Sequence, residues 1–255
     1  MDSTLAFVMK KHLILFTALF SLLVLACKPD AGSRDISPQK GYVSGTVTDT
    51  KGKPIEGAFV FISSTGPYSS GASAHTDNKG HYRIKMDYGA YRIYATFDKQ
   101  YAGKTYEIQL KPGNADSFSV DDSPIIDFSW VLSGSKPVPL QGYFGGYIGL
   151  YQGETNIPKN EVEFTFTASE LIDGSVPGGP IVLKPANASV QYLEDLPLGK
   201  YSVKAVHKPS GGTARLLALK NKDTGEISAS NGAISMEFNP ESGGFYRANI
   251  EFFER

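Results

Sequence analysis

The sequence is poor in the residues that build most metal, disulfide and catalytic sites. Its 255 residues include one cysteine, one tryptophan, four histidines and four methionines. A single cysteine cannot form a disulfide within the chain or supply a zinc site that needs several thiolates. An excess of positive charge is also absent, because 25 basic residues stand against 26 acidic ones and the formal net charge is −1. This balance disfavours a nucleic-acid-binding protein, whose affinity depends on basic residues that neutralise phosphates.

The longest hydrophobic run lies near the N-terminus. Residues 13–26 follow the basic stretch Lys10-Lys11 and end at the lone Cys27. This run is about fourteen residues long, whereas a membrane-spanning helix needs roughly 20. A basic end, a short apolar core and a small residue are typical of a secretory signal. We therefore expect residues 1–26 to be a signal peptide, with either Met1 or Met9 as the true start.

The end of this run resembles a bacterial lipobox, in the stretch Val24-Leu25-Ala26-Cys27. In bacterial lipoproteins that carry this motif, the chain is cut before the cysteine, and the cysteine carries the lipid. The resemblance implies lipidation of Cys27 and anchoring to a membrane of the bacterial cell envelope, the outer membrane in a Gram-negative cell. Several acyl chains, at about 0.8 kcal/mol per buried methylene, give stable anchoring. Residues 27–40 are polar, and we expect a flexible tether.

From Gly41 onward, hydrophobic and polar residues alternate, which indicates half-buried β strands. No window of eleven residues has a helical period with helix caps. We expect about seven short strands and an all-β sandwich over residues 41–133. The alternation covers residues 43–47, 58–62, 82–86, 91–95, 106–110 and 126–132.

Four segments of this region together resemble the carboxypeptidase regulatory-like domain. They are residues 45–49 (GTVTD), 52–60 (GKPIEGAFV), 76–84 (TDNKGHYRI) and 89–93 (GAYRI). The resemblance implies a seven-stranded, prealbumin-like β-sandwich. Each matching residue also has a folding role, such as Pro54, which fixes φ, and Asp77, which accepts backbone N–H bonds within its own turn. The resemblance therefore implies an architecture and no activity.

In the second half of the chain we recognise no family resemblance. Residues 133–137 read Ser-Gly-Ser-Lys-Pro and predict a domain boundary. Alternation resumes after it, and the Gly199-Lys200-Tyr201 segment echoes Gly89-Ala90-Tyr91 of the first half. We expect a second β-sandwich-like domain over residues 138–255. The fold class predicted for the chain is all-β, with two β-sandwich domains.

Few residues could support catalysis or metal binding. His75 and His81 flank the turn at Asp77, but they are more typical of surface residues beside a hairpin than of a zinc site. His207 ends a predicted strand near a serine that lacks a nucleophile elbow. Glu161 and Glu163 lie on one strand face at a spacing that a glycosidase would allow, although exposed glutamates are commoner there. We expect no catalytic residue, no metal and no cofactor.

Paired carboxylates in loops offer a calcium alternative. Asp121-Asp122 and Glu194-Asp195 are such pairs, and neither has the spacing of an EF-hand. Paired acids in loops are more often solvated, so we do not predict a calcium site.

Aromatic residues give the clearest candidate binding surfaces. Tyr143, Tyr147 and Tyr151 are spaced to lie on one strand face with glycines between them, which predicts a ligand platform on which sugars stack. The alternative is that these rings fill the core and the glycines allow close sheet approach. Phe59 and Phe61 face away from the apolar side of their strand. Either the second domain covers them or they form a partner surface.

These observations predict an envelope-anchored lipoprotein with a non-catalytic binding or scaffolding role. Its partners would be the membrane, through the lipid on Cys27, and a glycan or an envelope protein, but no nucleic acid. One alternative is a carbohydrate-binding accessory lipoprotein that uses an exposed tyrosine row. Another is a metal-dependent hydrolase, which would need a pocket where a histidine meets a carboxylate.

Overall fold

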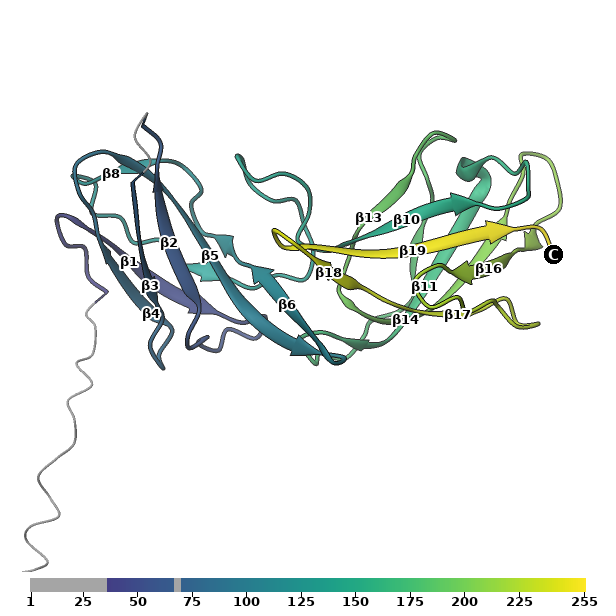
Figure 1. Ribbon diagram of the computed structural model, residues 1–255, viewed down its shortest axis with the longest axis horizontal. Helices are drawn as coiled ribbons and strands as arrows, with labels where there is room; N and C mark the ends of the chain where they lie inside the picture. Colours follow the sequence, from purple (N-terminus) through teal and green to yellow (C-terminus); the bar gives the residue numbers. More distant parts are fainter. Residues whose placement is uncertain (1–35, 67–69) are drawn as a thin grey trace, which may run out of the picture. The chain divides into compact units, whose positions relative to one another are not determined.

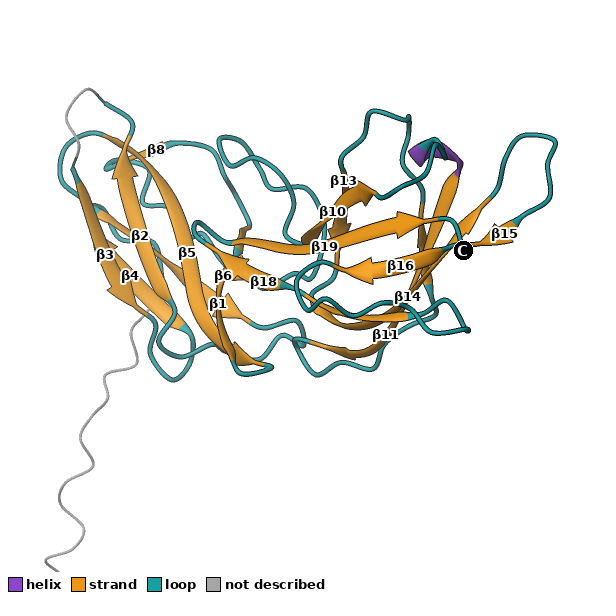
Figure 2. Ribbon diagram, turned by 45° about the vertical axis from the view of Figure 1, so that its right-hand side comes forward, coloured by secondary structure: helices purple, strands orange, loops and turns teal. Residues whose placement is uncertain are grey.

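The computed structural model describes residues 36–66 and 70–255. Residues Ile36–Arg255 form one compact unit. Strands dominate this unit, and the described residues contain one short 3-10 helix, Lys159–Glu161. Figures 1 and 2 show the strands grouped into several sheets. The predicted all-β class is confirmed. Within the described ranges, no helix has the length and apolar character needed to cross a membrane.

The first half of the described chain forms two sheets. One has the strand order β4-β1-β9-β7, and the other has the order β3-β2-β5-β6 with β8 added beside β5. The strands are β1 (Tyr42–Thr48), β2 (Phe59–Ser64), β3 (Gly71–His75), β4 (His81–Lys85), β5 (Ala90–Tyr101), β6 (Lys104–Gln109), β7 (Lys111–Pro112), β8 (Phe118–Ser119) and β9 (Phe128–Ser129).

Alternation places one side of each strand in a shared core. In β1, Val43 and Val47 are fully buried, and they lie on the same strand face as Gly45. Gly45 is required there because a Cβ would lie 2.0 Å from the backbone oxygen of Ile126. The same oxygen accepts a hydrogen bond from the buried Tyr82 hydroxyl. The glycine therefore lets β1 approach the segment that leads into β9.

The second half forms two further sheets. One has the order β13-β10-β19-β16 with β18 beside β19, and the other has the order β12-β11-β14-β15 with β17 beside β14. The strands are β10 (Gly146–Gln152), β11 (Val162–Leu171), β12 (Ile181–Leu183), β13 (Tyr192–Leu196), β14 (Gly199–His207), β15 (Arg215–Leu216), β16 (Ala218–Asn221), β17 (Ile234–Glu237), β18 (Asn239–Glu241) and β19 (Phe245–Phe253).

Two of the strand pairs are parallel. β1 pairs with β9 in parallel, and β10 pairs with β19 in parallel over six residue pairs. Parallel neighbours need a crossover connection, so strands far apart in the sequence become adjacent in space. The parallel β10–β19 pair lies at the centre of its sheet, where Ile148, Leu150 and Ile250 are buried.

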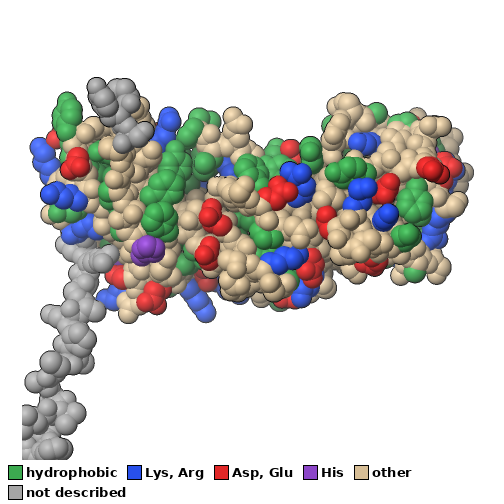
Figure 3. All heavy atoms as spheres, in the orientation of Figure 1, with side chains coloured by type: hydrophobic (Ala, Val, Ile, Leu, Met, Phe, Trp, Pro, Cys, Tyr) green, Lys and Arg blue, Asp and Glu red, His purple; other side chains and the backbone are tan. Residues whose placement is uncertain are grey.

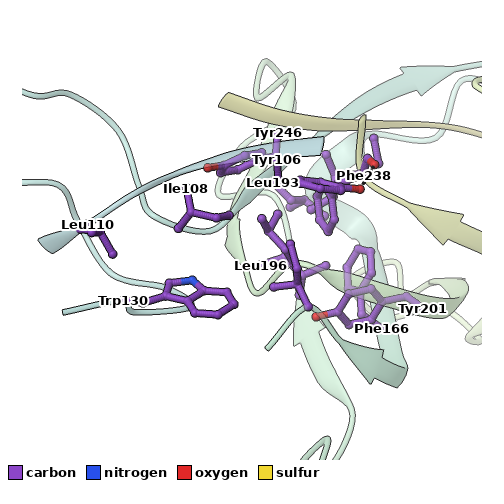
Figure 4. Packing of buried hydrophobic residues seen from close by; sticks show 14 of the residues in the cluster. Tyr106, Ile108, Leu110, Trp130, Phe166, Leu193, Leu196, Tyr201, Phe238 and Tyr246 are labelled. Carbon is purple, nitrogen blue, oxygen red and sulfur yellow. Dashed lines mark hydrogen bonds between the residues drawn. The ribbon is translucent and has the colours of Figure 1, made fainter. Parts of the chain in front are cut away.

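Buried residues of the first two sheets and the last two form one continuous hydrophobic cluster. Figure 4 shows part of it, with Tyr106 and Tyr246 beside Phe238. The Tyr106 hydroxyl donates to the backbone oxygen of Phe238 at 2.7 Å, and the Tyr246 hydroxyl donates to that of Glu107 at 2.6 Å. We call this contact between β6 and the β18–β19 hairpin the tyrosine seam.

The predicted boundary at residues 133–137 is closely attached to the second half. Gly134 donates its N–H to the carboxylate of Asp195, and Ser135 bridges to Tyr143. Lys136 is only 8% exposed, donates to the backbone oxygen of Gly244 and lies 4.9 Å from the centre of the Phe245 ring. Burial lowers the pKa of this lysine. The domain limits themselves stay a prediction.

Candidate functional site

The outer face of β2 carries an aromatic row. Phe59 and Phe61 alternate with the buried Val60 and Ile62, so they point away from the core. The rings of Phe59 and Phe61 stack at 5.7 Å between centroids, and Tyr94 of β5 stacks on Phe61 at 5.2 Å. Phe59 is 38% exposed. Figure 3 shows hydrophobic side chains gathered over β2 and β5, next to a histidine.

This aromatic row forms one wall of a cleft of about 390 Å³. A second wall is the segment Pro137–Leu140, in which Val138 is 79% exposed and the Val138–Pro139 peptide bond is cis. Pro112 and Ala115 add apolar surface from the chain after β6. The volume lies in the range typical of small-ligand sites. We name this feature the aromatic cleft.

Four polar side chains also line the aromatic cleft: Arg92, Thr96, Glu107 and Gln109. Gln109 donates its amide N–H to the backbone oxygen of Gly243 at 2.9 Å. Among the described residues, Oε1 of Gln109 and Nε of Arg92 are buried polar atoms that have no hydrogen-bond partner. Because an unpaired buried polar group costs about 1–3 kcal/mol, these atoms are positioned to gain from a ligand that pairs with them.

The structure keeps two of the three tyrosines of the predicted platform together, because the rings of Tyr143 and Tyr147 lie 6.4 Å apart between centroids. Tyr147 and Tyr151 lie on the outer face of β10, and Tyr151 is 45% exposed. Tyr143 lies before the strand, where its backbone N–H donates to the Tyr147 hydroxyl at 3.1 Å. The Cβ position of Gly149 is occupied by the side-chain oxygen of Asn249, at 2.5 Å. This glycine therefore makes room for a side chain of the neighbouring strand β19 and also for the Tyr151 ring, 3.3 Å from the Cβ position.

Tyr147 instead lines a separate groove of about 440 Å³, which we name the Tyr147 groove. Tyr192 of β13 and Phe245 of β19 supply two further aromatic rings, each at least 40% exposed. Arg247 lies over the Tyr192 ring at 5.8 Å and pairs with Glu241 at 3.1 Å. Glu194 also lines this groove. Aromatic rings beside carboxylates and a guanidinium can bind a polar ring compound such as a sugar.

The histidines near the Asp77 turn do not meet. His75 is exposed at the sheet edge and packs on Phe59, with 5.3 Å between ring centroids. His81 lies on β4, with its Nδ1 3.9 Å from an Asp77 oxygen. Asp77 accepts the backbone N–H groups of Lys79 and His81, as the turn chemistry predicts. No group of three or more His, Cys, Asp or Glu side chains arranged for a metal occurs in residues 36–66 and 70–255.

His207 does meet a carboxylate. Its Nε2 is 2.9 Å from Oε2 of Glu161, and the Nε–H of Arg215 donates to its Nδ1 at 3.2 Å. An acceptor at Nδ1 requires the tautomer whose Nε2 carries the proton, which then donates to Glu161. Both ring nitrogens are thus engaged, and they join Glu161, directly before β11, to β14 and β15. Glu163 pairs separately with Lys208 at 2.6 Å.

The paired acids have structural partners. Asp122 accepts the backbone N–H and the hydroxyl of Ser119, and these hydrogen bonds lower the pKa of its carboxyl. Asp195 accepts the N–H groups of Gly134 and Gly145. Cys27, the predicted lipidation site, lies outside the described residues.

A comparison with known protein families supports the fold of the first two sheets. Residues 42–121 match the carboxypeptidase regulatory-like domain. This match confirms the resemblance over the first half of the chain, and it covers β1 to β8, including β2 and β5 of the aromatic cleft. A search of curated proteins found no match.

Solved structures give only distant likenesses. The Streptococcal ancillary pilin is 14% identical, with a TM-score of 0.25, and the match covers 84% of this chain and 62% of that one. The Bacillus anthracis TIE protein is 18% identical, with a TM-score of 0.30 and coverage of 84% and 34%. The major pilin subunit BcpA of Bacillus cereus is 10% identical, with a TM-score of 0.25 and coverage of 85% and 100%. The chain spans less than two thirds of the first two, and scores this low carry no functional inference.

Sequence reasoning found Phe59 and Phe61 but missed the rest of the aromatic cleft. Tyr94 and Arg92 lie on the outer face of β5 of the regulatory-like domain, where the same alternation that identifies Phe59 would have placed them. Pro137–Leu140 could not have been found this way, because a segment without regular structure reaches the cleft only through the tertiary fold.

Proposed function

We propose that this protein is an envelope-anchored lipoprotein that binds a protein or glycan partner without catalysis, and that the aromatic cleft is its binding surface. The observation that supports this proposal is the partly exposed row of Phe59, Phe61 and Tyr94 along a cleft of about 390 Å³. Aromatic anchors in a concave surface are typical of binding hot spots. Contiguous exposed apolar surface on a folded domain marks an interaction site.

The anchoring part rests on the sequence. A lone cysteine directly after a short apolar run resembles the lipobox arrangement, and the regulatory-like domain begins soon after it. Full-length protein expressed in bacteria should incorporate an alkyne fatty-acid probe and sediment with membranes. A Cys27→Ser variant should lose the label and move to the soluble fraction. Equal labelling of the two proteins would contradict the proposed anchoring.

The binding part is tested on the full chain in detergent. Glycan arrays and pull-downs of envelope proteins should yield a partner whose capture is at least tenfold weaker for Phe61→Ala, because truncation of a central aromatic anchor costs about 1.4 kcal/mol or more. Tyr88→Ala is the matched control, since Tyr88 is 97% exposed and lies away from the cleft. Equal capture by Phe61→Ala and wild type, with both folded, would place binding elsewhere.

A carbohydrate-binding role at the Tyr147 groove is the second candidate. It is favoured by four aromatic residues that line the groove with Glu194, Glu241 and Arg247: Tyr147, Tyr192, Phe245 and Tyr246. Under this alternative, glycan binding falls for Tyr192→Ala and stays unchanged for Phe61→Ala. The opposite pattern would favour the aromatic cleft.

A hydrolase has no comparable support. His207 meets Glu161, but Arg215 occupies its other ring nitrogen, so the pair holds three strands together.

A further inference from the structure

β5 has a gap in its hydrogen-bonded ladder. On one side it pairs with β2 continuously from Tyr91 to Thr96. On its other side β6 pairs only from Thr96 onward, and β8 covers only Ala90 and Tyr91. Leu110 extends the β6 side by one bond, from its N–H to the backbone oxygen of Ala95. Among the described residues, none pairs with positions 92–94 on this side of β5.

The gap exposes one backbone donor and one acceptor. In an antiparallel strand, the N–H and C=O of alternate residues point to the same side. The carbonyl of Ala95 points toward β6, so the N–H and C=O of Ile93, two residues earlier, point the same way. Ile93 lines the aromatic cleft. The cleft therefore contains an unpaired strand edge, in line with the end of β6 and the start of β8.

Side chains at the gap supply a charge and a flat apolar surface. Arg92 and Tyr94 flank Ile93 and, by alternation, lie on the outer face of the sheet. The guanidinium of Arg92 has no ion-pair partner within the described ranges, and its Nε is buried without a hydrogen bond. Tyr94 continues the aromatic row from Phe61. A ligand that fills the gap would thus meet an aromatic ring at one end and a positive charge at the other.

We propose that the aromatic cleft binds an extended peptide segment of a partner protein, which adds to β5 as a short strand between β6 and β8. This inference rests on the proposed function and names its partner class. Both β6 and β8 run antiparallel to β5, so a peptide in line with them runs antiparallel too. Its residues then face Tyr94, Ile93 and Arg92 in that order.

The geometry sets the sequence of the peptide. Three positions fit, over about 10 Å at roughly 3.4 Å per residue, before the peptide meets Leu110 and Phe118. The residue opposite Tyr94 carries an aromatic ring, and the residue opposite Arg92 carries a carboxylate. The middle residue pairs with Ile93, and its side chain points to the core side, so it is small and apolar. Strand addition of this kind obtains affinity from the main chain and specificity from alternate side chains.

The test uses full-length protein in detergent and a fluorescent pentapeptide, acetylated and amidated, of sequence Gly-Tyr-Ala-Glu-Gly. Its three central residues fill the three free positions, and the terminal glycines are flexible so that the chain can turn away from the sheet at both ends. Binding is measured by fluorescence anisotropy. Three control peptides each remove one feature: the reversed order Gly-Glu-Ala-Tyr-Gly, a glutamine in place of the glutamate, and N-methylation of the alanine. N-methylation removes the N–H that would donate to Ile93, so it tests strand addition without changing any side chain.

We expect each control peptide to bind about tenfold more weakly than the parent, because a lost charged or buried hydrogen bond costs about 1.4 kcal/mol or more. Arg92→Gln should weaken the parent peptide and remove the preference for glutamate over glutamine. Arg83→Gln is the matched control, since it removes the same charge from β4 and should leave binding unchanged. Circular dichroism verifies that both variants are folded.

Absence of binding by the parent peptide, or equal binding of the N-methylated one, would overturn the inference. So would an unchanged glutamate preference in Arg92→Gln. If the peptides fail while a partner captured in the earlier assay still depends on Phe61, only the peptide inference falls. If neither the capture assay nor the peptide assay detects binding, the proposed function is overturned as well.

Discussion

Gly45 is the position in β1 where the packing leaves no room for a side chain. Its added Cβ would lie 2.0 Å from the backbone oxygen of Ile126, and backbone cannot move aside as a flexible side chain can. We predict that Gly45→Ala lowers the free energy of unfolding by about 2–4 kcal/mol, at or beyond the range for overpacking a core. Chemical denaturation followed by circular dichroism measures this change.

Gly178→Ala is the matched control. A Cβ at Gly178 meets nothing within 4 Å, so its stability should change by less than about 0.5 kcal/mol. Equal stability of the two variants would mean that β1 does not approach Ile126 as closely as described.

Asp173 ties the turn after β1 to the turn after β11. Its carboxylate accepts the hydroxyl of Thr50 at 2.7 Å and that of Ser175 at 2.6 Å. Partial burial raises the pKa of this carboxyl, but the hydrogen bonds outweigh burial and hold it below 3.8. A carboxyl whose pKa is lower in the folded state than in the unfolded state stabilises the fold when the pH is above its unfolded pKa. This stability is lost as the pH falls through the folded-state pKa.

We therefore predict that Asp173→Asn is less stable than wild type at pH 6 and that the difference shrinks below pH 3.8. Urea titrations at several pH values measure it. Asp87→Asn serves as the control, because no hydrogen bond ties Asp87 to another of the described residues. A constant difference across this pH range would show that the charge of Asp173 contributes nothing.

At this residue scale, alternation is informative only inside strands. It correctly predicted that Phe59 and Phe61 face away from the core, because both lie in β2. It did not predict that Tyr143 lies outside the strand, since Gly142 adopts a positive φ of 85° and β10 begins only at Gly146, although the Tyr143 ring still contacts that of Tyr147. A four-residue spacing of tyrosines predicts a common face only where the strand is continuous.

At the scale of elements, sequence predicts strands better than their partners. Residues 43–47 were predicted as a strand and lie within β1, and the other predicted ranges of the first half also overlap strands. β3 was missed because Gly71–His75 has small, exposed residues, and its pairing with β2 defines it. The parallel pairing of β10 with β19 spans about a hundred residues, and no local pattern carries such information.

The end of β14 illustrates how one side chain can join elements. His207 is buried and connects Glu161, beside β11, with Arg215 of β15, which pairs in turn with Glu254 at 2.9 Å. We predict that His207→Ala lowers the unfolding free energy by about 2–3 kcal/mol, since it removes a buried ring together with its hydrogen bonds to Glu161 and Arg215. His75→Ala, at an exposed edge, should change it by less than about 0.5 kcal/mol. Similar losses for the two variants would contradict this structural role.

At the scale of the whole molecule, the tyrosine seam joins the first two sheets to the last two. Tyr106 and Tyr246 lie 5.9 Å apart between ring centroids, and each hydroxyl crosses to a backbone oxygen of the other half. Sequence reasoning predicted two separate sandwiches but not this contact. Tyr106 was expected only as a strand residue, because alternation shows that a side chain is buried without showing what buries it.

The tyrosine seam predicts alkaline unfolding. Burial raises the pKa of Tyr106 from 10.0 to about 12, and burial also raises that of Tyr246. A raised folded-state pKa means that the unfolded chain releases its proton first. The stability contributed by these hydroxyls is therefore complete below pH 10 and falls as the pH rises toward 12.

The double variant Tyr106→Phe/Tyr246→Phe should lose about 1–2 kcal/mol at pH 7 through its missing hydrogen bonds. Above pH 10, it should then lose stability less steeply than wild type, because neither ring can ionise. Urea unfolding between pH 7 and pH 11 measures both effects, with the exposed Tyr88→Phe as the control. Parallel stability curves for wild type and the double variant would show that the two hydroxyls remain exposed to water and do not join the halves.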